Sequence, residues 1–285
     1  MNAHQLHPGR LTSYGAGSRA IWAWNPIGCA IVFVHGFAGA AMETWSEFPT
    51  ELRTAPELAG WDFFFFGYDG MHTEAVSSAF SLRKFLNDLS SDPTALFKNS
   101  DSSKTSTRRH PPRYDRIILV AHSLGALVAR RAMLDALNCP KQASWPERTE
   151  LILFAPAHNG AKIITLVSET IGAFRGVLTA VNFLGKLIVL EDLREGSRTL
   201  INLKDDLKRL FDGGQASLRA RLVVTAKNDA VVRNATLYPD FSPEELVASH
   251  QSVCKPNAQY FDPLTILLGA LKKSEDETLG VSHDE

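Results

Sequence analysis

Short apolar runs recur along the chain at positions 29–34, 61–66, 116–120, 149–154 and 219–226. Each run is shorter than an ordinary helix and contains at least three consecutive apolar residues, so it does not alternate throughout between apolar and polar residues as a half-exposed strand does. Strands of a parallel sheet have this pattern, because helices cover both faces of such a sheet. The runs therefore predict buried strands of one mostly parallel sheet.

A further strand is predicted near the N-terminus, at positions 19–24. The turn-forming residues Asn25, Pro26 and Gly28 separate it from the run at 29–34. This spacing predicts a hairpin between the two strands.

Helical periodicity appears between the strands. Apolar residues recur every three or four positions at 74–89, 124–137 and 264–271, and also at 44–58, where prolines are expected to break the helix. Alternating strands and helices predict an α/β fold, a mostly parallel sheet flanked by helices. Residues 1–273 are enough to form it as a single domain.

Two segments lack this regular pattern. Segment 90–113 is rich in Ser, Thr and Pro, and we expect it to be a flexible, solvated insertion. Residues 274–285 are acidic and are predicted to form a disordered tail.

Segment 160–200 contains the most apolar part of the chain. Arg175 and Lys186 leave only ten uncharged residues between them, so the segment is too interrupted to span a membrane. Its glycines predict several short helices. Two interpretations remain open: an apolar helical cap over the carboxyl edge of the sheet, or an additional pair of core helices. A cap would line a substrate pocket with Phe174, Leu178, Val181 and Phe183.

Composition excludes some functions. The chain has 285 residues, 45% of them hydrophobic, and 30 basic against 31 acidic residues leave a net charge of -1. Because no overall field attracts polyanions, we expect no nucleic-acid partner. Three cysteines without C-x-x-C spacing argue against a disulfide framework or a zinc site. They favour a reducing compartment, and residues 1–20 lack the apolar stretch of a secretory signal, so a cytoplasmic protein is expected.

The strand at 116–120 and the helix that begins at Leu124 meet at Ser123. Small residues flank this serine, Ala121 on one side and Gly125 on the other. A strand-to-helix turn this tight is strained and lifts the serine Oγ above the sheet edge, as a nucleophile requires. The alternative is an ordinary strand-to-helix corner that contains a serine by chance.

A glycine-containing loop, His35 to Gly39, follows the strand at 29–34. Backbone N–H groups in such a loop, together with the N–H of the residue after the nucleophile, can bind a developing oxyanion. We therefore expect Phe37 and Leu124 to form an oxyanion hole. His35 itself is expected to have a structural role.

Candidates for the acid and the base follow in chain order. Asp229 comes directly after the strand at 219–226, and His250 follows that acid. Ser123, Asp229 and His250 therefore occur in the order that a catalytic triad takes on this kind of sheet. His158 also follows a strand but precedes the acid, so we expect it to be structural or to line the site. Asp69 is expected to form a turn.

The combined motifs resemble the α/β-hydrolase superfamily. The most similar branch is lipase-like and includes GPI inositol-deacylase-like and serine-active-site lipase-like proteins. The resemblance spans most of 21–271 and rests on Val34-His35-Gly36-Phe37, Thr44-Trp45, Phe66-Gly67-Tyr68-Asp69, Ala121-His122-Ser123-Leu124-Gly125, His250 and Lys255-Pro256.

The resemblance implies the α/β-hydrolase fold and hydrolysis of acyl esters without a metal or organic cofactor. The implied partner is a small-molecule or lipid ester, which leaves peripheral contact with a membrane open. A thioester would suit the same residues. A non-catalytic module of this fold that binds a ligand or a protein is the alternative function, although such a module does not need all three triad residues.

Overall fold

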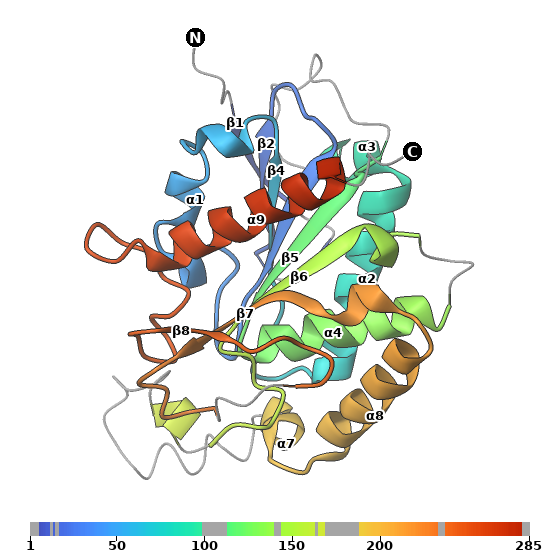
Figure 1. The fold of residues 1–285 in the computed structure, drawn as a ribbon, viewed down its shortest axis with the longest axis vertical. Helices are drawn as coiled ribbons and strands as arrows, with labels where there is room; N and C mark the ends of the chain where they lie inside the picture. The colour runs from blue at the N-terminus through green and yellow to red at the C-terminus, as the bar shows by residue number, and fades with distance from the viewer. Residues whose placement is uncertain are drawn as a thin grey trace.

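The computed structural model describes residues 6–11, 14, 17–98, 113–139, 144–162, 165–168, 188–232 and 237–280. Within these residues, eight strands form one sheet in the order β1-β2-β4-β3-β5-β6-β7-β8 (Figure 1). The strands are β1 (Leu6–Arg10), β2 (Arg19–Ala23), β3 (Cys29–Val34), β4 (Asp62–Phe66), β5 (Arg116–His122), β6 (Thr149–Phe154), β7 (Ala220–Ala226) and β8 (Glu244–Leu246).

The sheet is parallel from β4 to β8, as the unbroken apolar runs predicted. The predicted hairpin is wrong, because β2 pairs antiparallel with β4 and not with β3. β3 instead lies between β4 and β5, paired in parallel with both. β1 adds an antiparallel strand at the edge next to β2.

Helices cover both faces of this sheet. Figure 1 shows α1 and α9 on one face, and α2, α4 and α8 on the other. The helical segments are η1 (Glu43–Trp45), α1 (Phe48–Glu51), η2 (Pro56–Leu58), α2 (Ala75–Ser91), α3 (Pro93–Lys98), α4 (Leu124–Leu137), η4 (Pro146–Arg148), α7 (Val189–Leu193), α8 (Arg198–Asp212), η5 (Ala216–Leu218) and α9 (Asp262–Gly280).

Two boundaries differ from the sequence predictions. The expected flexible insertion at 90–113 begins inside α2, and α3 occupies 93–98, while 99–112 lie outside the described residues. The expected disordered tail also begins too early, because α9 continues to Gly280. Local composition predicted neither extension, since both helices run into polar residues.

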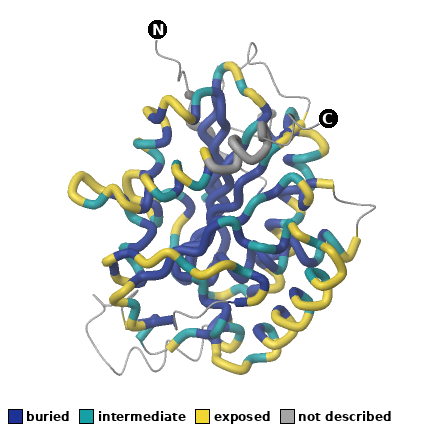
Figure 2. The backbone as a smooth tube through the Cα atoms, viewed as in Figure 1, coloured by how far each residue is buried: buried dark blue, intermediate teal, exposed yellow. Residues whose placement is uncertain are grey.

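The core follows the sheet, where Figure 2 shows an almost continuous buried backbone. All four phenylalanines of β4, Phe63 to Phe66, are at most 1% exposed, which confirms burial on both faces. Phe33 of β3 stacks on Phe65 with ring centroids 4.9 Å apart, and its other neighbours include Trp45 at 4.8 Å. Aromatic pairs at this separation add to the stabilisation from buried area.

No helix among the described residues is both long enough and apolar enough to cross a bilayer.

A buried ion pair connects α4 to the segment after β7. Arg130 of α4 and Asp240 are in direct contact, with side chains 0% and 2% exposed. Asp240 also accepts a hydrogen bond from the N–H of Ala220 at 2.9 Å, and Arg130 donates to the carbonyl of Leu218 at 2.8 Å. Because α4 begins directly after Ser123, this pair supports the helix that carries the candidate nucleophile.

We predict that Asp240→Ala lowers the free energy of unfolding by about 3–5 kcal/mol, because it leaves a buried guanidinium without its counter-charge. Urea unfolding followed by circular dichroism measures this loss. The control is Glu57→Ala, which removes an exposed ion pair with Lys272 and should cost less than about 1 kcal/mol. Equal losses for the two variants would contradict the importance of the buried pair.

Candidate active site

The carboxyl ends of the parallel strands meet at one edge of the sheet. Val34 of β3, Ala121 of β5 and Leu153 of β6 are paired in register, so the residues after them emerge side by side. Ser123 follows β5 at this edge, and Asp229 follows β7. The sheet therefore brings together residues that are far apart in the sequence.

The backbone of Ser123 is strained, with φ 52° and ψ -119°. A residue with a side chain seldom adopts this region, and it persists only where neighbours hold it. Here the Ser123 N–H donates to the carbonyl of Phe154 at 3.0 Å, and its carbonyl accepts from the N–H of Ala157 at 3.3 Å. The end of β6 thus holds the turn that sequence analysis predicted.

Two glycines make room for this turn. A Cβ on Gly125 would lie 2.3 Å from the carbonyl oxygen of Val34 and 2.4 Å from that of His35. A Cβ on Gly36 would lie 2.9 Å from the Cβ of Ser123. Real Cβ atoms do not approach this closely, so only glycine lets the loop after β3 pack against the start of α4.

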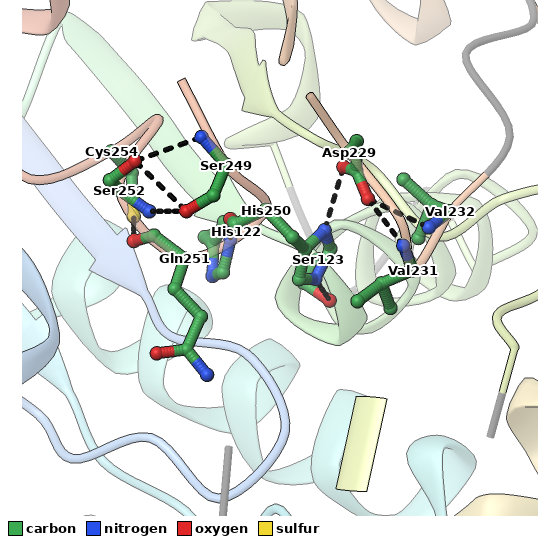
Figure 3. A network of polar contacts seen from close by, with 10 residues as sticks. All are labelled: His122, Ser123, Asp229, Val231, Val232, Ser249, His250, Gln251, Ser252 and Cys254. Atoms are coloured by element: carbon green, nitrogen blue, oxygen red, sulfur yellow. Dashed lines mark hydrogen bonds and ion pairs between the residues drawn. The ribbon is translucent and has the colours of Figure 1, made fainter. Parts of the chain in front are cut away.

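The three predicted side chains form one hydrogen-bonded chain (Figure 3). His250 Nε2 lies 2.9 Å from the Oγ of Ser123, and His250 Nδ1 lies 2.8 Å from Oδ2 of Asp229. Ser123 and His250 are each 1% exposed. In this arrangement His250 can accept the serine proton at Nε2 while Nδ1–H donates to the carboxylate.

The Asp229 carboxylate is held by three donors. Besides His250, the backbone N–H groups of Val231 and Val232 donate to its Oδ1 at 2.8 and 2.9 Å. Burial alone would raise the pKa of Asp229, but these hydrogen bonds and the charge of His250 outweigh it and hold the pKa below its usual value. The carboxylate therefore remains ionised and oriented toward the imidazole.

The loop after β3 lies where the oxyanion hole was predicted. Gly39 N–H donates to the carbonyl of Gly36 at 3.1 Å and closes a turn around Phe37 and Ala38, in which Ala38 has φ 50°. The N–H of Phe37 has no acceptor among the described residues. The N–H of Leu124 is the first of α4, and helix geometry leaves such groups free to bind an anion.

A histidine that sequence analysis did not single out supports the base. His122 Nε2 lies 2.9 Å from the backbone carbonyl oxygen of His250, so Nε2–H donates there. Burial, followed by the charge of His250, lowers the pKa of His122 to about 3. His122 therefore stays neutral and holds the loop of His250. Its position next to the candidate nucleophile was the only sequence signal for this role.

His35 has the structural role expected of it. Its Nδ1–H donates to the carbonyl of Gly36 at 2.8 Å, and its Nε2 accepts from the N–H of Tyr68 at 3.3 Å. The Tyr68 ring stacks on it at 4.3 Å, and the Tyr68 hydroxyl donates to the His35 carbonyl at 2.7 Å. Burial lowers the pKa of His35 to about 4. Tyr68, which sequence analysis assigned only to a motif, thus fixes the start of the candidate oxyanion loop.

The sequence agrees with the geometry. A model of the alpha/beta hydrolase family matches residues 31–265. The chain belongs to this family. Membership supports a hydrolase activity, and the observed sheet is that of the α/β-hydrolase fold.

Solved structures of other hydrolases are similar in fold. The Bacillus licheniformis lipase BlEst2 has a TM-score of 0.52 and 15% identity, with 93% of this chain and 99% of that chain covered. The Saccharomyces cerevisiae peroxisomal hydrolase Lpx1 has a TM-score of 0.49 and 12% identity, with 94% and 83% covered. The Legionella pneumophila phospholipase PlaB has a TM-score of 0.47 and 18% identity, with 73% and 44% covered. No curated protein sequence matches this hydrolase.

A cavity of about 260 Å³ opens at Ser123. Phe37 and His250 line it, whereas the predicted pocket residues Phe174, Leu178, Val181 and Phe183 lie outside the described residues. The full set of described lining residues is Gly36, Phe37, Ala38, Gly39, Ala40, Glu43, Thr44, His122, Ser123, Leu166, His250, Gln251 and Lys255.

The two alternative polar residues have other roles. His158 is 2% exposed and is absent from the described cavity wall, and burial lowers its pKa well below the usual value. Asp69 accepts from the N–H groups of Met71 and His72, both at 3.0 Å, which confirms the predicted turn. Within the described ranges, no group of three or more His, Cys, Asp or Glu side chains could hold a metal ion.

We predict that Gly125→Ala destabilises the fold by about 2 kcal/mol or more, because the new methyl overlaps two backbone carbonyls that cannot rotate away. Thermal denaturation measures the effect. The matched control is Gly269→Ala in α9, where a Cβ would meet nothing within 4 Å. That change should stabilise the helix by up to about 1 kcal/mol. An unchanged melting temperature for Gly125→Ala would show that the strand-to-helix turn at Ser123 is not tightly packed.

We also predict that acid destabilises the fold through His122 and His35. Both have folded pKa values, about 3 and about 4, below the 6.5 of an ordinary histidine. Between pH 6.5 and the folded pKa, the unfolded chain therefore binds more protons than the folded protein. The free energy of unfolding keeps this contribution in full above pH 6.5 and loses it as the pH falls toward 4. Each histidine should contribute about 1.4 kcal/mol per pH unit.

Urea unfolding across this pH range tests the effect, with His122→Asn and His35→Gln each expected to flatten the slope. His72→Asn is the control, because His72 is exposed. An unchanged slope in both buried-site variants would contradict the prediction.

Proposed function

We propose that this protein is a serine hydrolase that cleaves carboxylic (acyl) esters through an acyl-enzyme. The observation that carries the proposal is the continuous hydrogen-bonded chain from Asp229 through His250 to Ser123, at 2.8 and 2.9 Å, beside the start of α4. A binding module has no need for a buried carboxylate, a buried imidazole and a strained serine in line.

In the first half of the reaction, Ser123 Oγ attacks the ester carbonyl carbon while its proton passes to His250 Nε2. The carbonyl oxygen becomes an oxyanion, which the N–H groups of Phe37 and Leu124 bind. The positive end of the α4 dipole adds to this stabilisation. His250 then returns the proton to the leaving alkoxide, and the alcohol departs.

In the second half, water replaces the alcohol. His250 Nε2 takes one proton from the water as its oxygen attacks the acyl carbon, and the C–Oγ bond breaks with return of that proton to Ser123. Asp229 orients the imidazole and stabilises its positive charge in both halves. The sequence of steps requires no cofactor, and a thioester can react through the same groups.

Lipid-like esters are the substrate class that we propose. The sequence motifs resemble the branch that includes GPI inositol-deacylase-like and serine-active-site lipase-like proteins, and BlEst2, which shares the fold, is described as a lipase. The proposal includes two further predictions. One is contact with a membrane surface, and the other is an acyl pocket formed by Phe174, Leu178, Val181 and Phe183, which lie outside the described residues.

We predict that Ser123→Ala abolishes both ester turnover and labelling by a fluorophosphonate, because the variant lacks only the attacking hydroxyl. Asp229→Asn and His250→Ala should each reduce kcat by roughly 10⁴, and the double variant should be little worse than His250→Ala, because the three groups act as a unit. Steady-state kinetics with para-nitrophenyl esters measure these losses.

Ser81→Ala is the control, since Ser81 is exposed on α2 and its hydroxyl donates to the carbonyl of Ser77 at 3.2 Å. It should retain labelling and turnover. Labelling that persists in Ser123→Ala would assign the nucleophile to another serine. Additive losses in the double variant would contradict a coupled acid and base.

A further inference from the structure

The described wall of the active-site cavity combines apolar and polar surface in equal measure. Apart from the loop at 36–40, only Leu166 contributes an aliphatic side chain, whereas Glu43, Thr44 and Lys255 contribute charged or polar ones. A pocket for a purely apolar acyl group has few such groups, because burying them without partners is unfavourable. This part of the cavity therefore fits a polar portion of the substrate.

Lys255 is the cation of this wall. It lies five residues after His250 and is half-buried. Its backbone N–H donates to the carbonyl of Ser252 at 2.9 Å, and the next carbonyl, that of Pro256, accepts from the N–H of Glu47 at 3.3 Å. The backbone that carries Lys255 is thus anchored to Ser252 and to Glu47, the residue before α1.

No carboxylate within the described ranges forms an ion pair with Lys255. Other lysines of the chain do form such pairs, Lys208 with Asp212 at 2.6 Å and Lys272 with Glu57 at 3.0 Å. The charge of Lys255 acts on the site itself, where it contributes to the low pKa of His122. An unneutralised ammonium beside the reacting groups attracts an anion most strongly where solvent is partly excluded.

Glu43 is the opposite charge in the same wall, and it does not neutralise Lys255. No ion pair joins these two described residues, although both line the cavity. Glu43 is exposed, and its charge acts on His35. Of the two residues Glu43 is the more exposed, so solvent screens its charge more strongly.

We propose that Lys255 binds a negatively charged group of the substrate, so that this hydrolase prefers esters with a carboxylate or phosphate near the scissile bond. The inference rests on the ester hydrolysis proposed above and narrows its substrate class. A charge-assisted hydrogen bond from the ammonium selects such an ester over a neutral ester of the same length. Lys255 is then a specificity-determining residue that takes no part in proton transfer.

Two matched pairs of esters test the proposal. In the first, para-nitrophenyl hexanoate is compared with the para-nitrophenyl monoester of adipic acid, whose acyl chain has the same length but ends in a carboxylate. In the second, monohexanoylglycerol is compared with its phosphate monoester. The first pair places a carboxylate on the acyl side of the ester, and the second places a phosphate on the alcohol side. Comparing the two pairs therefore shows which of these groups Lys255 binds.

The readout is the ratio of kcat/KM for the anionic ester to that for its neutral partner. The wild type should favour the anionic ester in one pair, and Lys255→Met should reduce that ratio about tenfold to hundredfold, chiefly through KM. Lys255→Arg, which keeps the charge, should retain the preference. Lys272→Met is the control for loss of a lysine far from the cavity and should leave the ratio unchanged. Added salt should reduce the wild-type ratio.

An unchanged ratio in Lys255→Met, or an equal loss for both members of each pair, would overturn the proposal and assign Lys255 a structural role. A wild type that prefers the neutral ester in both pairs would overturn it as well. Failure of the proposed function looks different: none of the esters would be consumed, and a fluorophosphonate would not label Ser123.

Discussion

The close approach of two backbone segments is the constraint on which the rest of the site depends. The loop that leaves β3 passes so near the start of α4 that a single methyl on Gly125 would overlap the carbonyls of Val34 and His35. This contact places the N–H of Phe37 and the Oγ of Ser123 at the same sheet edge. A strained serine persists there because β6 on the far side also holds its backbone.

Neutral histidines support the charged part of the site. His122 holds the carbonyl of His250, and His35 holds Gly36 and Tyr68. Burial keeps the pKa of both well below the usual value, so neither brings a second positive charge next to His250. The His250 imidazole, to which we assign the proton transfer, is paired instead with the ionised carboxylate of Asp229.

The polarity of the cavity changes the picture of the substrate. From the sequence, the apolar segment at 160–200 suggested that hydrophobic contact sets specificity. The described wall adds Glu43, Thr44 and Lys255 to the apolar side chains of Phe37 and Leu166. An ester that has both an apolar part and a charged part suits such a wall.

The sequence alone determined the features that depend on local periodicity and chain order. Five mainly apolar runs identified buried strands, because a strand covered on both faces has no polar side. The order of candidate residues after those strands singled out Ser123, Asp229 and His250. Tertiary structure decided the rest. β2 pairs with β4, and His122 meets a carbonyl 128 residues away. Glu43 and Lys255 share one cavity. These outcomes depend on which distant segments lie side by side, and no local pattern of apolar and polar positions encodes that, because hydrogen-bond partners and cavity walls form only when the sheet and its helices pack together.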